Sequence, residues 1–303
     1  MRKFFRTLWW IITAPFRFIL WILKRIGSWF KNVFVDIGKV FTDEPDDKPI
    51  VDTVSMAFDD PKEFWFALLE HLNALRKHIF RAVLFLVITT AITIVFMRDI
   101  LAWITKPVGG IEALQAIEVT ESIGVVMRIA LLGGFALALP YITFELYLFI
   151  APGLKSRARV LGLIAIPVAF LFFVAGMAFA YFVMMPTALP FLINFMGIKT
   201  VPRPASYIKF VTGLMFWIGI AFQFPLVIFA LAGMGIVRSE DLIKQWRIAI
   251  VVIAVISAAI TPTIDPVNMA LVMGPMIVLY FLSVFLARIA QGRREKSEIQ
   301  AQT

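Results

Sequence analysis

The chain has 303 residues, of which 61% are hydrophobic, whereas ordinary soluble domains contain about 45–50%. Only 16% of the residues are charged, so a soluble fold of this size could not bury the apolar surface, and the sequence predicts a membrane protein. The net charge of +9 is typical of cytoplasmic loops in such a protein and argues against a nucleic-acid site. Because there is no Cys and the only His are His71 and His78, disulfides are excluded and no metal site is expected.

Residues 1–41 form a basic segment in which Trp, Phe and Ile are interspersed with Lys and Arg. A secretory signal is excluded, because Pro15 and Arg17 interrupt the longest apolar run. We predict one or two amphipathic helices that lie on an anionic membrane face and bind anionic lipids. A short extra span or re-entrant hairpin, or a helix that binds a partner protein, remains an alternative.

Residues 42–63 are rich in Asp, Glu and Pro, which predicts a solvated acidic linker that does not pack. This linker separates the basic extension from a membrane domain at 64–294. A cytoplasmic tail at 295–303 follows the membrane domain.

Six apolar segments of the membrane domain are candidates for transmembrane helices, each of which needs about 20 residues. They lie at residues 79–97, 122–150, 160–186, 207–234, 247–260 and 267–286. Five prolines lie within these segments, and each should favour a kink because it removes a backbone hydrogen bond. They are Pro140, Pro167, Pro186, Pro225 and Pro275. The predicted fold class is therefore an all-α membrane protein with six transmembrane helices.

Lys and Arg are distributed unevenly between the two sides of these six spans. Fourteen lie in the loops and flanks on one side, against four on the other. Because short cytoplasmic loops carry the excess of Lys and Arg, both ends of the six-span core are predicted to be cytoplasmic.

Polar side chains at membrane depth are costly, so each is a functional candidate. Glu145 in the second span and Gln223 in the fourth could either bond neighbouring helices together or line a functional surface. Glu121 and Arg128 lie seven residues apart on one helix face, which predicts an ion pair at the outer interface.

The sequence contains no nucleophile motif, zinc-protease motif or phosphate-binding loop, so no catalytic residue and no enzymatic activity are expected. The stretch from Glu70 to Arg76 has apolar residues at helical spacing and is either an amphipathic lead-in helix or a docking surface. The stretch from Phe149 to Leu154 ends the second span, because Pro152 begins a Pro-Gly turn.

These features resemble the TatC family, the core subunit of the twin-arginine protein translocase, from about Phe64 to Arg294. Five motifs in the family's order carry the resemblance. They are His71-Leu72-Asn73-Ala74-Leu75-Arg76; Phe149-Ile150-Ala151-Pro152-Gly153-Leu154; Gly176-Met177-Ala178-Phe179-Ala180-Tyr181-Phe182 with Pro186; Phe222-Gln223-Phe224-Pro225; and Thr261-Pro262 with Asp265, Asn268, Pro275 and Leu279-Tyr280.

The resemblance implies a cupped bundle of six helices in the cytoplasmic membrane. Members of the family bind twin-arginine signal peptides on the cytoplasmic face and recruit single-span TatA/TatB-like subunits. The oligomeric assembly exports folded precursor proteins with the proton-motive force, and it uses no cofactor.

Roles for individual residues are expected from these motifs, from the stretch Glu70–Arg76 and from the polar positions in the spans. Signal-peptide binding is expected at Glu70, His71, Leu75, Arg76, Phe149, Pro152 and Arg157. An intramembrane polar or partner contact is expected at Glu145 and Gln223, and an outer-side role at Glu121, Arg128 and Asp265.

Three family acids are replaced in this chain, by Ala74, Ala158 and Phe281. The first two are the acids that the family uses against the arginine pair, and a methyl group cannot replace a carboxylate in that role. Glu70 lies one helical turn before Ala74 and could supply a negative charge on the same face. Alternatively, Glu70 pairs only with a nearby Lys or Arg. The alternatives to a receptor are a secondary transporter of a small solute, and a non-receptor paralogue or scaffold within a translocase complex.

Overall fold

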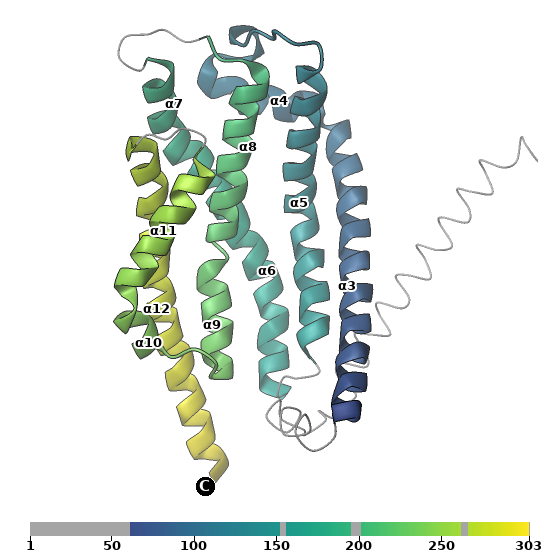
Figure 1. Cartoon of the computed structure of the whole chain (residues 1–303), viewed down its shortest axis with the longest axis vertical. Helices are drawn as coiled ribbons and strands as arrows, with labels where there is room; N and C mark the ends of the chain where they lie inside the picture. Colours follow the sequence, from purple (N-terminus) through teal and green to yellow (C-terminus); the bar gives the residue numbers. More distant parts are fainter. Residues whose placement is uncertain (1–60, 152–155, 195–200, 262–265, 303) are drawn as a thin grey trace, which may run out of the picture. The chain divides into compact units, whose positions relative to one another are not determined.

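The structure, a computed structural model, describes residues 61–151, 156–194, 201–261 and 266–302 (Figure 1). The predicted basic extension and nearly all of the predicted acidic linker lie outside these residues, as does the last residue of the tail. Every regular element within the described ranges is helical, in agreement with the predicted fold class.

Ten α-helices are described. They are α3 (Pro61–Val95), α4 (Met97–Thr105), α5 (Glu121–Ile150), α6 (Ser156–Phe179), α7 (Met185–Ile193), α8 (Pro204–Ala221), α9 (Phe224–Met234), α10 (Ser239–Lys244), α11 (Trp246–Ile260) and α12 (Pro266–Gln302). Two 3₁₀ turns, Lys106–Val108 and Ile111–Ala113, follow α4. A π-helical turn, Ala180–Met184, joins α6 to α7.

Within the described ranges, five stretches are long and apolar enough to cross a membrane. They are His71–Val95, Glu121–Ile150, Gly162–Ile193, Pro204–Met234 and Pro266–Gly292. The sixth apolar helix, Trp246–Ile260, has only 15 residues. The six segments predicted from apolar runs are therefore present, and the fifth is short, as its sequence predicted.

Prolines affect the helices in two ways. Pro186 stands in the first turn of α7, which follows the π-helical turn. Pro225 stands in the first turn of α9, where the fourth apolar stretch is interrupted between α8 and α9. Pro140, Pro167 and Pro275 instead lie inside helices that run on without a break. The missing N–H of proline costs least in the first turn of a helix, where the backbone N–H groups have no partner within the helix.

The chain divides into two compact units. The first consists of Met1–Leu72 and Leu146–Arg159, and its described parts are the start of α3, the end of α5 and the start of α6. The second consists of Asn73–Glu145 and Val160–Thr303 and contains the rest of the described helices.

Within the second unit, α3 and α5 lie side by side (Figure 1), and they approach closely at Gly133 and Gly134. A Cβ added to Gly134 would lie 2.6 Å from the Cα of Thr90, which leaves no room for any side chain. The hydroxyl of Thr89 uses this proximity to donate a hydrogen bond of 2.8 Å to the carbonyl oxygen of Gly134. Small residues let helix backbones come this close in a membrane protein, where the lipid gives no hydrophobic drive for helix association.

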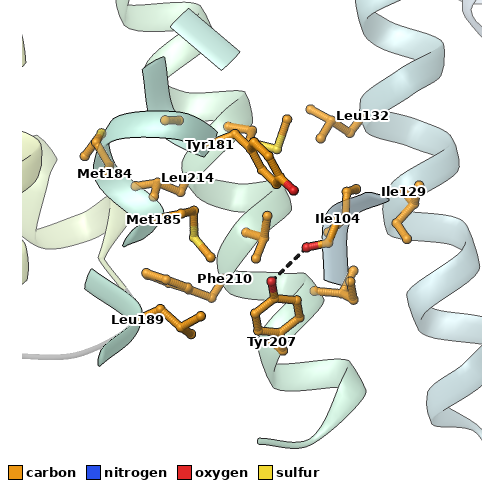
Figure 2. Packing of buried hydrophobic residues seen from close by; sticks show 14 of the residues in the cluster. Ile104, Ile129, Leu132, Tyr181, Met184, Met185, Leu189, Tyr207, Phe210 and Leu214 are labelled. Carbon is orange, nitrogen blue, oxygen red and sulfur yellow. Dashed lines mark hydrogen bonds between the residues drawn. The ribbon is translucent and has the colours of Figure 1, made fainter. Parts of the chain in front are cut away.

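The largest hydrophobic cluster packs α4, α5 and α8 around the π-helical turn (Figure 2). The C-terminal carbonyls of α4 have few partners within the helix. Tyr207 donates a 2.8 Å hydrogen bond to the carbonyl oxygen of Ile104, and Tyr181 donates one of 2.6 Å to that of Trp103. The Tyr181 ring also stacks on the Trp103 ring at 4.0 Å. Two tyrosines therefore fasten the end of α4 to the spanning helices.

The last three helices pack against one another, and α12 also packs against α9. Small buried residues, such as Ala232 on α9 and Ala287 on α12, form the contact between α9 and α12. Tyr280 on α12 donates a hydrogen bond to the carbonyl oxygen of Leu242 on α10. α12 therefore contacts α9, α10 and α11.

Candidate functional site

The two motif segments of the first unit touch each other. The ring of His71 on α3 lies against the ring of Phe149 near the end of α5, with centroids 4.4 Å apart and planes inclined by 35°. Apolar side chains on the same stretch of α3, Trp65, Leu69 and Leu72, are exposed. The first unit thus presents an aromatic contact beside exposed apolar side chains.

The other residues expected to bind a signal peptide are less completely described. Leu75 is half-buried and Arg76 is exposed, and both continue α3 beyond His71. The side chains of Glu70 and Arg157 and the whole of Pro152 lie outside the described part of the chain.

A polar cluster surrounds Glu145 in the second unit. Its side chain is buried, with 1% of its surface exposed. Nδ1 of His78 lies 2.6 Å from one carboxylate oxygen, and the hydroxyl of Tyr141 donates to the other. A guanidinium nitrogen of Arg81 lies 3.9 Å away. The carboxylate therefore has hydrogen-bonding partners from its own helix and from α3.

This cluster satisfies a carboxylate that would otherwise be expensive to bury. Hydrogen bonds to a buried charge are stronger than neutral ones, because the low dielectric of the surroundings increases their electrostatic part. Glu145 therefore bonds α3 to α5, which is one of the two roles that the sequence left open. The sequence did not identify His78 and Arg81 as its partners, because 67 residues separate His78 from Glu145.

Gln223 also bonds two helices. Its side-chain amide donates a 2.9 Å hydrogen bond to the carbonyl oxygen of Ala169 on α6. Gln223 stands at the interruption between α8 and α9, so this bond ties α6 to the point where the fourth apolar stretch breaks. Nearby, α6 and α8 cross closely, since a Cβ on Gly176 would lie 2.8 Å from the Cα of Gly219.

At the opposite end of the bundle, Glu121 begins α5 and is buried. Arg203, just before α8, donates to its carboxylate and donates a second bond of 3.0 Å to Glu118. The hydrogen bond to Glu121 and then that to Glu118 raise the pKa of the Arg203 guanidinium, because both stabilise its charged form.

The predicted ion pair between Glu121 and Arg128 is wrong. Glu121 pairs with Arg203 instead, and Arg128 is exposed and forms no ion pair within the described ranges. The error arises because residues seven apart share a helix face but lie about 10 Å apart along the axis, whereas the chain before α8 returns to the very start of α5. Asp265, the third residue expected on this side, lies outside the described residues.

No group of three His, Cys, Asp or Glu that could hold a metal ion occurs among the residues with a described placement. Glu145, Gln223 and Glu121 instead join helices or pair with neighbouring charges.

The family model for Sec-independent protein translocase protein (TatC) matches residues 70–275. A curated protein of that name from Carboxydothermus hydrogenoformans is 34% identical over 76% of this chain and 96% of its own length. The chloroplastic protein of the same name from Arabidopsis thaliana is 31% identical over 76% of this chain and 68% of its own length. A crystal structure of the twin-arginine translocase receptor TatC covers 73% of this chain and 99% of its own, at 29% identity and a TM-score of 0.65. The chain therefore belongs to the TatC family of Sec-independent protein translocase proteins.

Proposed function

We propose that this chain is the receptor and core subunit of a translocase that exports folded proteins bearing twin-arginine signal peptides. The names of its relatives and the matched receptor structure support this function. The six apolar helices in the family's order support it over a small-solute transporter, since no internal repeat is visible in the sequence.

The observation that carries the proposal is the contact between His71 and Phe149. Each residue belongs to one of the two motifs to which the family resemblance assigns signal-peptide binding. Because their rings touch, the two motifs contribute to one surface rather than to two separate ones. Exposed Trp65, Leu69 and Leu72 add apolar area, which suits the hydrophobic part of a signal peptide.

Recognition of an arginine pair needs negative charge, and Ala74 and Ala158 supply none. Glu70 stands one turn before Ala74 on α3, and residues at i and i+4 of a helix lie about 6 Å apart on one face. We therefore assign to Glu70 the carboxylate that pairs with the signal arginines. The bidentate geometry of Arg with a carboxylate then gives specificity over a lysine pair.

The test is the affinity of a twin-arginine signal peptide for the purified chain in nanodiscs, with a twin-lysine peptide as the control. Glu70→Gln should weaken binding more than about tenfold, equivalent to about 1.4 kcal/mol, and Ala74→Glu should strengthen it. If the unaltered chain binds both peptides equally and Glu70→Gln changes nothing, the chain is not itself a receptor. The non-receptor paralogue within a translocase complex then becomes the better assignment.

The same proposal places the chain in the bacterial inner membrane with both ends of its six-span core in the cytoplasm. Its partners would be precursor proteins and single-span TatA/TatB-like subunits in an oligomeric complex driven by the proton-motive force. The basic residues 1–41 would hold it to anionic lipids. Crosslinking in native membranes followed by co-purification tests the partners: the absence of single-span subunits and of precursors from the complex would contradict this assignment.

A further inference from the structure

A cavity of about 550 Å³ lies in the second unit between helices that are distant in the sequence. Its lining comes from α3, α5, α8 and α11, and most of it is apolar or aromatic. The aromatic residues of the lining are Phe135, Phe210, Phe216 and Trp217. Thr212 lines it as well, but its hydroxyl already donates to the carbonyl oxygen of Ile208.

Two cations, Arg128 and Lys209, line this apolar cavity, and both are exposed. No acidic residue lines it among the described residues, and neither cation forms an ion pair there. Two like charges without a counter-charge in an apolar surrounding are costly, so an anion that joins them is strongly favoured.

The depth of the two cations limits what the anion can be. Arg128 lies seven residues after the start of α5 and Lys209 five residues after the start of α8, which places them about 10 Å and about 8 Å along their helices. At this depth long basic side chains extend toward the headgroup level while their stems remain among apolar groups. The Lys and Arg count of the loops predicts that this end of the bundle faces away from the cytoplasm.

We propose that the cavity binds one anionic phospholipid of the outer leaflet, with its phosphate between Arg128 and Lys209 and part of an acyl chain against the aromatic lining. Charge complementarity supports the headgroup, because a phosphate accepts hydrogen bonds from both cations. The apolar remainder of the cavity supports the chain.

The size of the cavity favours a lipid over a transmembrane helix of a partner. A helix of 20 residues, about 10 Å wide and about 30 Å long, occupies about 2,400 Å³, several times the volume of the cavity. Such a helix could lie across the opening but could not fill it. A phosphate with a stretch of acyl chain fits within 550 Å³, a volume in the range of small-molecule sites.

Trp217 offers a direct reporter, because it lines the cavity. The full chain in nanodiscs is titrated with phosphatidylglycerol that carries brominated acyl chains, and the tryptophan quenching is compared with that of Trp217→Phe. The difference isolates the Trp217 signal from the other tryptophans and from lipid bound by residues 1–41. We expect saturable quenching of Trp217, and about tenfold weaker affinity in the double variant Arg128→Gln with Lys209→Gln.

The matched control is Arg98→Gln with Lys106→Gln, which removes two exposed cations from the same side of the bundle but outside the cavity. This control should bind as the unaltered chain does, and Arg128→Lys with Lys209→Arg should retain most of the affinity. Circular dichroism melting shows whether each variant is folded. If the double variant Arg128→Gln with Lys209→Gln is unfolded, the test uses the unaltered chain instead. Its Trp217 quenching by brominated phosphatidylglycerol is then compared with the quenching by brominated phosphatidylcholine.

Equal quenching by both lipids, or an equal loss of affinity in the control pair, would overturn the proposal, since the site would then not recognise the lipid's charge. The proposal also fails if the double variant Arg128→Gln with Lys209→Gln binds phosphatidylglycerol as tightly as the unaltered chain but no longer crosslinks to an acidic single-span helix. In that case the cations would serve a partner protein.

Discussion

Nδ1 of His78 lies 2.6 Å from the carboxylate of Glu145, whose side chain is buried. This contact joins α3 to α5 within the second unit, a few turns from Gly133 and Gly134, where the same two helices approach closely. The polar bond and the close approach support each other: the small residues bring the helices together, and the bond fixes their register.

Removal of either partner of this pair should destabilise the protein. His78→Leu leaves a buried carboxylate with fewer partners, so we expect the free energy of unfolding to fall by about 2 kcal/mol. Glu145→Leu should also be destabilising. The free energy of unfolding lost in the double variant should be smaller than the sum of the two single losses, by about 1 kcal/mol or more. Reversible unfolding in sodium dodecyl sulfate, followed by circular dichroism, measures these energies. Strictly additive losses would show that the two side chains do not interact.

The close approach of α3 and α5 predicts that Gly134 tolerates no side chain. A Cβ there would meet the backbone of Thr90, which cannot move aside as a flexible side chain could. Gly134→Ala should therefore lower the free energy of unfolding by about 1–3 kcal/mol. Gly124→Ala on the same helix is the control, because a Cβ at Gly124 meets no atom within 4 Å. Equal stability of the two variants would contradict the packing.

The two tyrosines that hold the end of α4 should differ in importance. Tyr207→Phe removes the side-chain donor to the Ile104 carbonyl, and a loss of about 1–2 kcal/mol is expected. Tyr181→Phe should cost less, because the Trp103 carbonyl also accepts a backbone hydrogen bond from Lys106. The same detergent unfolding assay compares them. A larger loss for Tyr181→Phe would show that the backbone bond does not substitute for the hydroxyl.

Arg203 should be needed to hold the start of α5 to the chain before α8. Arg203→Gln removes the cation from Glu121 and Glu118, so the melting temperature should fall. The melting temperature should fall less in Arg203→Lys, because lysine keeps the positive charge but lacks the planar guanidinium that bonds two carboxylates. Arg128→Gln provides a comparison on the same helix as Glu121. If it lowers the melting temperature as much as Arg203→Gln does, the assignment of Arg203 as the partner is wrong.

The orientation of the chain can be tested with single cysteines, because the natural sequence contains none. A Cys at Ser156 should be protected from an impermeant thiol reagent in intact cells, whereas a Cys at Thr200 should react. Permeabilised cells, in which both should react, provide the control. The reverse pattern in intact cells would invert the topology, and with it the proposed cytoplasmic recognition surface.

Much of the fold was predictable from the sequence, because the thickness of the bilayer sets the length of each apolar run. The second span was predicted at 122–150 and observed at Glu121–Ile150. The fourth was predicted as one element, but it is interrupted between Ala221 and Phe224. Pro225 pointed to this place, although a proline alone does not say whether a helix bends, breaks or continues, as Pro140 inside α5 shows.

The candidate site was predicted less completely. The sequence by itself determined that Glu145 and Gln223 lie within long apolar runs, since this follows from counting residues. Only the tertiary structure decided that Glu145 meets His78, that Gln223 meets Ala169, and that Glu121 meets Arg203 rather than Arg128. The physical reason is that burial of a polar group requires some partner but does not specify which one. The partner is chosen by the packing of helices that are far apart in the chain.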